Sequence, residues 1–323
     1  MQGKRFSRTT ATLTVAVLVG LVLPVAAFGW GAATHTYLAK ELGNDCGLMD
    51  LNEMYGAVTP DMFNLLFGHP HRDYLWTETH YGFMKVVGEG TWGRKKAFAY
   101  GFASHNEAFG ADHTAHLDSI LYPGDGYVPT KVGILAPWLE PEIEAFLVAN
   151  GIPHTPALVE ELAEVFADTA IESAVDLLVS RKEDPTVGVE MFLAAGLRGP
   201  FVPFLLWEAY GGDYVAHTGT RPLIAALFFL ATEKRFRENM MLYGLVLAQD
   251  DAVALMAEQG AELASAMLEG EYGIQADVPP ALVEWALLAA VAVVEFDYSA
   301  ELEATLEFVE DQLELHGIET SSW

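Results

Sequence analysis

Apolar residues recur at helical spacing along almost the whole chain, and this pattern most constrains the fold. The repeat runs from about Thr34 to Leu315, whereas alternating strand patterns bounded by turns are nearly absent. The sequence therefore predicts an all-α protein. Glycine, proline and aspartate punctuate the clearest helical segments. These segments are predicted over residues 141–149, 156–180, 221–248, 251–268 and 280–315.

Two stretches, residues 223–231 and 282–294, are apolar enough to suggest contact with lipid. Each is shorter than the roughly 20 apolar residues that a membrane span needs, and charges bound both. We therefore expect both to be buried core helices. Residues 210–219 contain three glycines and are expected to form a loop.

The first 29 residues have the pattern of a secretory signal peptide. Lys4, Arg5 and Arg8 precede the apolar stretch 11–28, and small residues lie near Trp30. The apolar stretch is also long enough for an uncleaved anchor, although the small residues favour cleavage. We expect cleavage before Trp30, a secreted or periplasmic protein, and one all-α domain over residues 30–323.

The chain is strongly acidic, with a net charge of −28, which becomes −31 when the three basic residues of the signal segment are removed. Such a field disfavours binding along a nucleic-acid backbone. Bound metal ions can reverse the sign locally, so a phosphate-containing substrate stays open. The single cysteine, Cys46, leaves no intrachain disulfide, so stability must come from packing or from metal.

Residues 101–119 combine histidines with an aspartate in what reads as one helix. His105, Asp112 and His116 stand at i, i+7 and i+11, which at about 100° per residue places them within about 20° of one line. Imidazoles and a carboxylate on one helix face suit a divalent metal, and zinc is the usual occupant. A solvated polar helix is the alternative interpretation. His113 points off this line.

Four motifs together resemble those of the zinc-dependent phospholipase C family. They are Trp-Gly-x-x-x-His from Trp30, Thr-Pro-Asp ending at Asp61, Thr-His-Tyr around His80, and the segment that begins at His105. The same superfamily contains the fungal single-strand-specific nucleases and glycosylphosphatidylinositol-specific phospholipase D. The resemblance spans motif order and spacing from Trp30 to about Asp176. It implies a multi-helix fold and two or three zinc ions.

The resemblance also implies metal ligands. The free amino group and carbonyl of an N-terminal Trp30 would bind one zinc together with His35, and a neutral α-amine loses its proton readily to a metal. Asp61 and His80 would meet His105 and Asp112 at a second zinc. Asp61 could also act as the general base that orients the attacking water.

Two departures from the family pattern stand out. The central histidine and aspartate are usually four residues apart, but Phe109 occupies that position, Asp112 lies seven residues from His105, and Gly110 leaves room for a break. The usual late histidine and acid pair is replaced by an acidic ladder in residues 166–178, which consists of Asp168, Glu172 and Asp176 at four-residue steps. We predict Asp168 and Glu172 as ligands. A solvated acidic face is the alternative, with His154 and His217 as substitute ligands.

The sequence leaves three functions open. The first is a zinc-dependent hydrolase of phosphodiester bonds, most simply a phospholipase C that acts on phospholipid and touches membrane surfaces transiently. The second is a single-strand nuclease of the same superfamily, which the acidic charge makes less favoured. The third is a metal-binding structural protein without turnover. No protein partner is inferred.

Overall fold

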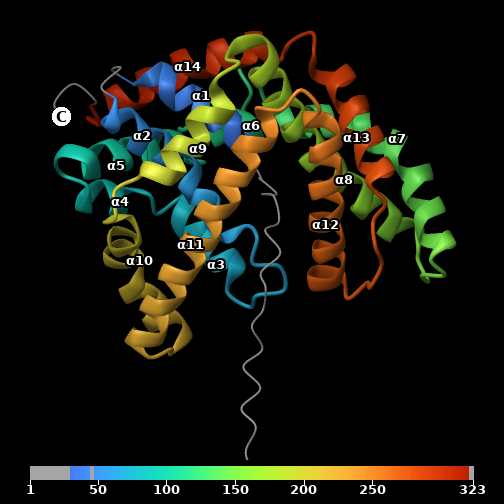
Figure 1. Cartoon of the computed structure of the whole chain (residues 1–323), viewed down its shortest axis with the longest axis horizontal. Coiled ribbons are helices and arrows are strands. Elements are labelled where there is room, and N and C mark those ends of the chain that lie inside the picture. The colour runs from blue at the N-terminus through green and yellow to red at the C-terminus, as the bar shows by residue number, and fades with distance from the viewer. Residues whose placement is uncertain (1–29, 44–46, 320–323) are drawn as a thin grey trace, which may run out of the picture.

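The computed structural model describes residues 30–43 and 47–319, and every regular element among them is a helix (Figure 1). The all-α prediction is therefore confirmed, while the expected signal peptide lies outside the described residues. The first half of the fold contains α1 (Ala32–Leu42), α2 (Leu48–Val58), the 3₁₀ helix η1 (Thr59–Phe63), α3 (Arg72–His80), α4 (Met84–Glu89), α5 (Gly93–His105), α6 (Ala111–His116) and α7 (Tyr127–Ala149). The second half contains α8 (Pro156–Leu178), the π-helical turn η2 (Val179–Glu183), α9 (Val187–Leu197), α10 (Val202–Thr218), α11 (Pro222–Leu247), α12 (Ala252–Tyr272), α13 (Pro280–Val294) and α14 (Tyr298–Leu315).

The helices form one body with two descending parts (Figure 1). α1 and α14 lie across the top, α10 and α11 descend on one side, and α12 descends on the other beside α8. Among the described residues, no single helix is long and apolar enough to cross a membrane.

Three predicted boundaries are wrong, and tertiary contacts explain each. Pro141 lies inside α7 rather than at a helix start, because a long packed helix tolerates the loss of one hydrogen bond. The predicted loop 210–219 belongs mostly to α10, where burial of Tyr210 and Tyr214 offsets the helix cost of glycine. The helix predicted over 280–315 breaks before Tyr298, where Asp297 accepts a hydrogen bond from Tyr127 at 2.8 Å.

α2 and α5 approach so closely that their backbones touch, and two glycines make this possible. A Cβ atom on Gly101 would lie 1.9 Å from the carbonyl oxygen of Glu53, and one on Gly56 would lie 2.1 Å from that of Phe98. α5 ends at His105, and η1 follows α2 directly. The glycine contact therefore sets the distance between the two segments that carry His105 and Asp61.

The start of α1 is fixed by a carboxylate from α8. Asp176 accepts hydrogen bonds from the backbone N–H groups of Ala33 and Thr34 and from the hydroxyl groups of Thr34 and Tyr243, at 2.7 to 3.0 Å. A carboxylate at a helix N-terminus satisfies otherwise unpaired N–H groups and complements the helix dipole. The last acid of the predicted ladder thus positions the helix that carries His35.

The glycine contact predicts an unequal effect of two alanine substitutions. Gly101→Ala should lower the free energy of unfolding by about 3 kcal/mol or more, because the added methyl group must push two backbones apart. Gly212→Ala, in α10, meets no atom within 4 Å and should raise it by up to about 1 kcal/mol. Urea unfolding of both variants measures the difference. Equal stabilities would contradict the close packing of α2 on α5.

Candidate metal centre

Histidine and acidic side chains from several helices converge where those helices begin or end. His80, His105 and His116 are the last residues of α3, α5 and α6. A helix C-terminus carries a partial negative charge, so three such ends favour a cation between them. Asp112 lies in the first turn of α6, and Asp61 lies in η1.

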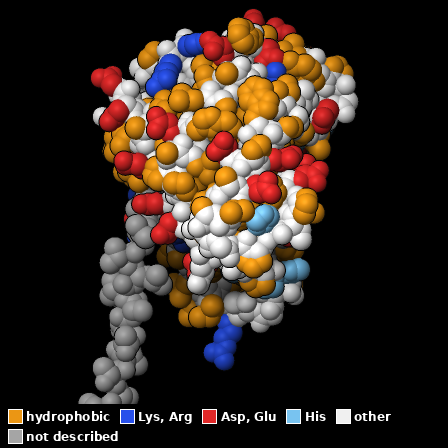
Figure 2. Space-filling model, turned by 90° about the vertical axis from the view of Figure 1, so that its right-hand side faces the viewer, with side chains coloured by type: hydrophobic (Ala, Val, Ile, Leu, Met, Phe, Trp, Pro, Cys, Tyr) orange, Lys and Arg blue, Asp and Glu red, His pale blue; other side chains and the backbone are white. Residues whose placement is uncertain are grey.

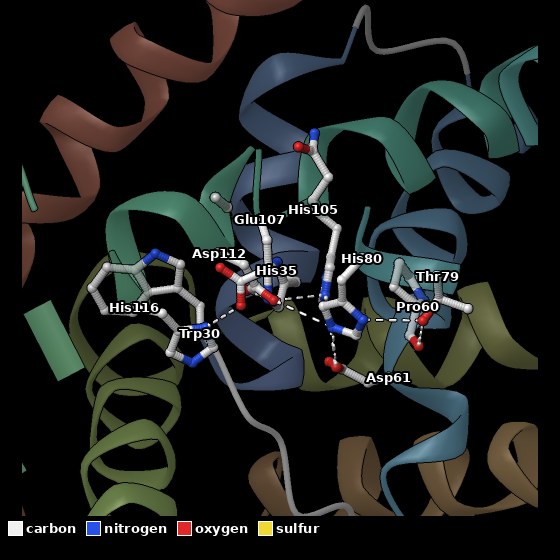
Figure 3. Close-up of polar contacts among 12 residues, drawn as sticks. Trp30, His35, Pro60, Asp61, Thr79, His80, His105, Glu107, Asp112 and His116 are labelled. Atoms are coloured by element: carbon white, nitrogen blue, oxygen red, sulfur yellow. Dashed lines mark hydrogen bonds and ion pairs between the residues drawn. The ribbon is translucent and has the colours of Figure 1, made fainter. Parts of the chain in front are cut away.

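Asp61, His80, His105 and Asp112 form the first ligand group, in which one ligand atom from each lies within 4.8 Å of the others. Figure 3 shows these four side chains pointing toward one another. The Nε2 atom of His105 lies 2.9 Å from Oδ2 of Asp112, and Nε2 of His80 lies 3.4 Å from Oδ1 of Asp61. All four residues are at most 1% exposed, so solvent does not screen their charges.

Backbone carbonyl groups fix which nitrogen of each central histidine faces the group. Nδ1 of His80 lies 2.9 Å from the carbonyl oxygen of Trp76, and Nδ1 of His105 lies 2.8 Å from that of Ala57. A carbonyl oxygen can only accept, so both Nδ1 atoms carry the hydrogen. The two Nε2 atoms then face each other at 3.2 Å, and a proton or a cation must lie between them.

Glu107, Asp112 and His116 form the second ligand group, again with ligand atoms within 4.8 Å of one another. Nδ1 of His116 lies 2.6 Å from Oε1 of Glu107, and the His116 side chain is 17% exposed. Asp112 belongs to both groups. His35 adds a third imidazole, because its Nε2 lies 3.0 Å from Oδ1 of Asp112 and its ring stacks on His105 with centroids 4.1 Å apart.

The buried charges change the pKa values of these groups in opposite directions. Burial alone would lower the pKa of His105, but the carboxylates of Asp112 and Asp61 raise it to about 9. Burial would also lower the pKa of His116, but its hydrogen bond to Glu107 outweighs this effect and raises the pKa to about 9. Burial and the charge on His105 lower the pKa of His35. Burial would raise the pKa of Asp112, but His105 and His35 hold it well below its usual range.

Two carboxylate oxygens test whether a cation fits this arrangement. Oδ2 of Asp61 and Oε2 of Glu107 are buried, and neither has a hydrogen-bond partner among the described residues. An unpaired buried oxygen of this kind costs on the order of 1 to 3 kcal/mol or more. A metal ion in the first group would coordinate the Asp61 oxygen, and one in the second group would coordinate the Glu107 oxygen. The residues therefore fit a buried divalent cation. The histidine and carboxylate set suits zinc among several divalent metals.

The prediction of one helix over residues 101–119 is wrong. α5 ends at His105 because the side chain of Asn106 accepts hydrogen bonds from the backbone N–H groups of Ala108 and Phe109, which forms a turn. α6 begins only after Gly110. His105, Asp112 and His116 therefore do not share one helix face. His105 and Asp112 meet across the turn, and His116 belongs to the second group.

The turn also brings in Glu107, which the sequence interpretation missed. On one continuous helix Glu107 would point about 200° away from His105, so helical spacing argued against it. The signal available was Gly110, because a break there releases the preceding residues from the helical phase.

The remaining predicted ligands lie near the two groups or outside them. Trp30 is buried, its indole N–H lies 3.3 Å from the hydroxyl of Thr114, and Figure 3 shows it near His116. Asp168 lines a groove of about 610 Å³ between α7 and α8. Burial raises the pKa of Asp168 to about 6, while the nearby His116 lowers it. Glu172 is buried in α8 and belongs to neither ligand group.

The two substitute histidines also lie outside both ligand groups. His154 is bonded to the carbonyl of Ile152 at 2.9 Å, and His217 stacks on Tyr74. Neither histidine replaces the missing late ligand in the described arrangement.

Comparisons of the chain with known protein families, with characterised proteins and with solved structures return no match. The resemblance to zinc-dependent phospholipase C therefore stays a prediction from sequence motifs. What the described residues show is a pair of buried histidine and carboxylate groups that could hold metal.

The shared position of Asp112 predicts how metal affinity responds to substitution. Asp112→Asn should lower metal affinity by about a hundredfold or more, because it weakens both ligand groups. His113→Ala should change it by less than about tenfold, because His113 stacks on Phe308 and bonds to the backbone of Glu107 instead. Competition titration against a zinc chelator measures both. A loss of less than about tenfold for Asp112→Asn would show that Asp112 is not a ligand.

The raised pKa values predict that metal uptake releases protons. Below about pH 9, both ring nitrogens of His105 and of His116 are protonated in the metal-free protein, so each imidazole is positively charged. A cation must displace one proton from each ring to bind there. Metal affinity should therefore increase as the pH rises from 6 toward about 9, and then level off. Calorimetric titrations in buffers of different ionisation enthalpy count the protons. Uptake without proton release at pH 7 would contradict the protonated state of both histidines.

Proposed function

We propose that this protein is a zinc-dependent hydrolase of phosphodiester bonds, similar to phospholipase C. The observation that carries the proposal is the sharing of Asp112 between two ligand groups, with His35 on the same carboxylate. A shared carboxylate could hold two cations near each other, and two such cations would stabilise both the attacking and the leaving oxygen of a phosphodiester.

Zinc would supply the activation of water and the neutralisation of phosphate oxygens. The chain's own residues hold that chemistry in place. His80 and His105 are oriented through their Nδ1 atoms by the carbonyl groups of Trp76 and Ala57. Asp61, which would also be a ligand of the first group, is the proposed base on the motif resemblance, and the Asn64 amide fixes its carboxylate by a hydrogen bond of 2.8 Å to Oδ1.

Access to substrate supports turnover at the second group. His116 is partly exposed, and the groove between α7 and α8 extends to the neighbouring Asp168. Catalytic zinc sites keep an open position, whereas structural sites are closed by protein ligands. In the proposal the open position therefore lies on the side of His116. An N-terminal amine at Trp30 would add a further ligand if cleavage occurs before it, and Figure 3 shows Trp30 on this side of Asp112.

A non-catalytic metal site is the second candidate, and the burial of the first group favours it. Asp61, His80, His105 and Asp112 supply four ligands and are almost fully buried, which is typical of a closed structural zinc site. In that case metal would raise the temperature of unfolding without any hydrolysis. Zinc-loaded protein that is stabilised yet inactive on every phosphodiester would establish this candidate.

The proposed function predicts a substrate preference. Zinc-loaded protein should release a phosphorylated head group from a zwitterionic phospholipid faster than it cleaves single-stranded DNA. The reason is charge, because 45 acidic residues against 17 basic ones repel a polyanion along its length but not a neutral lipid interface. A chelator should abolish both activities, and Asp112→Asn should do the same while His113→Ala retains most of the activity.

Assays of both substrates at two salt concentrations distinguish a phospholipase C-like enzyme from a nuclease. Faster cleavage of DNA at low salt, where repulsion is strongest, would favour a nuclease instead. Activity that survives complete removal of metal would contradict a metal-dependent mechanism.

A further inference from the structure

The start of α11 exposes large apolar side chains that the sequence interpretation placed in the core. Leu223, Ile224 and Leu227 are 70%, 54% and 51% exposed, and Leu230 is 44% exposed. Leu223, Leu227 and Leu230 stand at i, i+4 and i+7, so they share one helix face. The prediction that residues 223–231 form a buried core helix is therefore wrong for this face.

These side chains lie at a projecting end of the molecule. α10 ends at Thr218 and α11 begins at Pro222, and Figure 1 shows the turn between them at the lower end of the described chain. We call residues 218–227 the hairpin tip. A projecting convex tip can insert into the interface of a lipid bilayer, whereas it offers little flat area for contact with a folded protein.

The hairpin tip also differs in charge from the rest of the chain. The 19 residues 214–232 contain no aspartate or glutamate, although the chain has 45 acidic residues. Arg221 lies within the tip and makes no ion pair with any described residue, and the exposed His217 lies just before it. Figure 2 shows the flank on the other side of the molecule, where acidic side chains are scattered among apolar ones.

A second apolar face lies apart from the tip. α9 packs against the far half of α11, where Gly188 meets Gly244, and exposes Val189, Leu193 and Leu197 at i, i+4 and i+8. α9 and α10, which meet at a 75° bend, have together the length and composition of a membrane span, although neither helix has it alone. The exposed apolar face at the projecting tip marks an interaction site rather than scattered surface residues.

We propose that the hairpin tip docks on a lipid bilayer, with Leu223, Ile224 and Leu227 in the interfacial layer and Arg221 at the level of the phosphate groups. Apolar side chains supply the binding free energy, and an arginine beside them pairs with lipid phosphate. A second copy of the chain fits less well, since a symmetric contact between two tips would bring two Arg221 side chains together. The docking needs neither the metal centre nor hydrolysis.

A fluorophore at the tip tests the proposal with the processed chain that begins at Trp30, because the apolar stretch 11–28 would bind vesicles by itself. Cys46 is replaced by serine, and an environment-sensitive fluorophore is attached at Leu223→Cys or, as a matched control, at Leu315→Cys. Leu315 is 75% exposed on α14, at the opposite end of the molecule in Figure 1. Phosphatidylcholine vesicles should shift the emission at position 223 to shorter wavelength and leave position 315 unchanged, both with and without a metal chelator.

Substitutions near the label separate specific insertion from general adsorption. Ile224→Glu with Leu227→Glu should raise the vesicle concentration at half-maximal shift by at least about tenfold, since both replaced side chains lose their apolar burial. Leu315→Glu should leave it unchanged. Circular dichroism should show that all variants remain folded, which is expected because the replaced side chains are exposed.

Three results would overturn the proposal. One is the absence of a shift at position 223 with vesicles. Another is an equal shift at position 315, which would mean adsorption without a preferred surface. The third is a shift that appears without vesicles and grows with protein concentration, which would assign the tip to contact between copies of the chain. None of these results bears on metal binding or hydrolysis.

Discussion

The carboxylate of Asp112 lies buried among the imidazoles of His35, His80 and His105, and the structure around it depends on balancing that charge. A buried ion is tolerated only when opposite charges and hydrogen bonds compensate for its lost hydration. The compensating groups come from helices far apart in sequence. Asp176 fixes the start of α1, and the Gly56 and Gly101 contact fixes α5, so elements without any ligand of their own determine where the imidazoles lie.

Much of the fold and part of the site could be predicted from the sequence because the signals there are local. Helical spacing of apolar residues identified an all-α chain, since each helix must bury one face. Asp61, His80, His105 and Asp112 were named from residue type and motif order, and the structure brings the four together. The stated reason for His105 and Asp112 was wrong, however. A seven-residue interval fits both one helix face and two helix ends that meet across a turn.

The rest depends on contacts that no local pattern contains. The Asn106 side chain decides whether the helix ends, and only that ending brings Glu107 to His116. The apolar composition of the start of α11 predicts a buried helix. Its exposure, however, depends on which neighbouring helices cover it, and no described helix covers Leu223. The acids of the ladder are evenly spaced in sequence but have different roles in the structure. Asp176 caps α1, whereas Asp168 lines a groove.

One consequence of the shared carboxylate concerns how the two ligand groups would fill. Cations in both groups would draw on the same Asp112 oxygens and repel each other across a short, desolvated distance, so their binding cannot be independent. A second ion would then bind more weakly than the first, and by thermodynamic reciprocity each would lower the affinity for the other by the same factor. Under the proposed two-ion occupancy, loading would be negatively cooperative, and a singly occupied protein would persist over a range of metal concentrations.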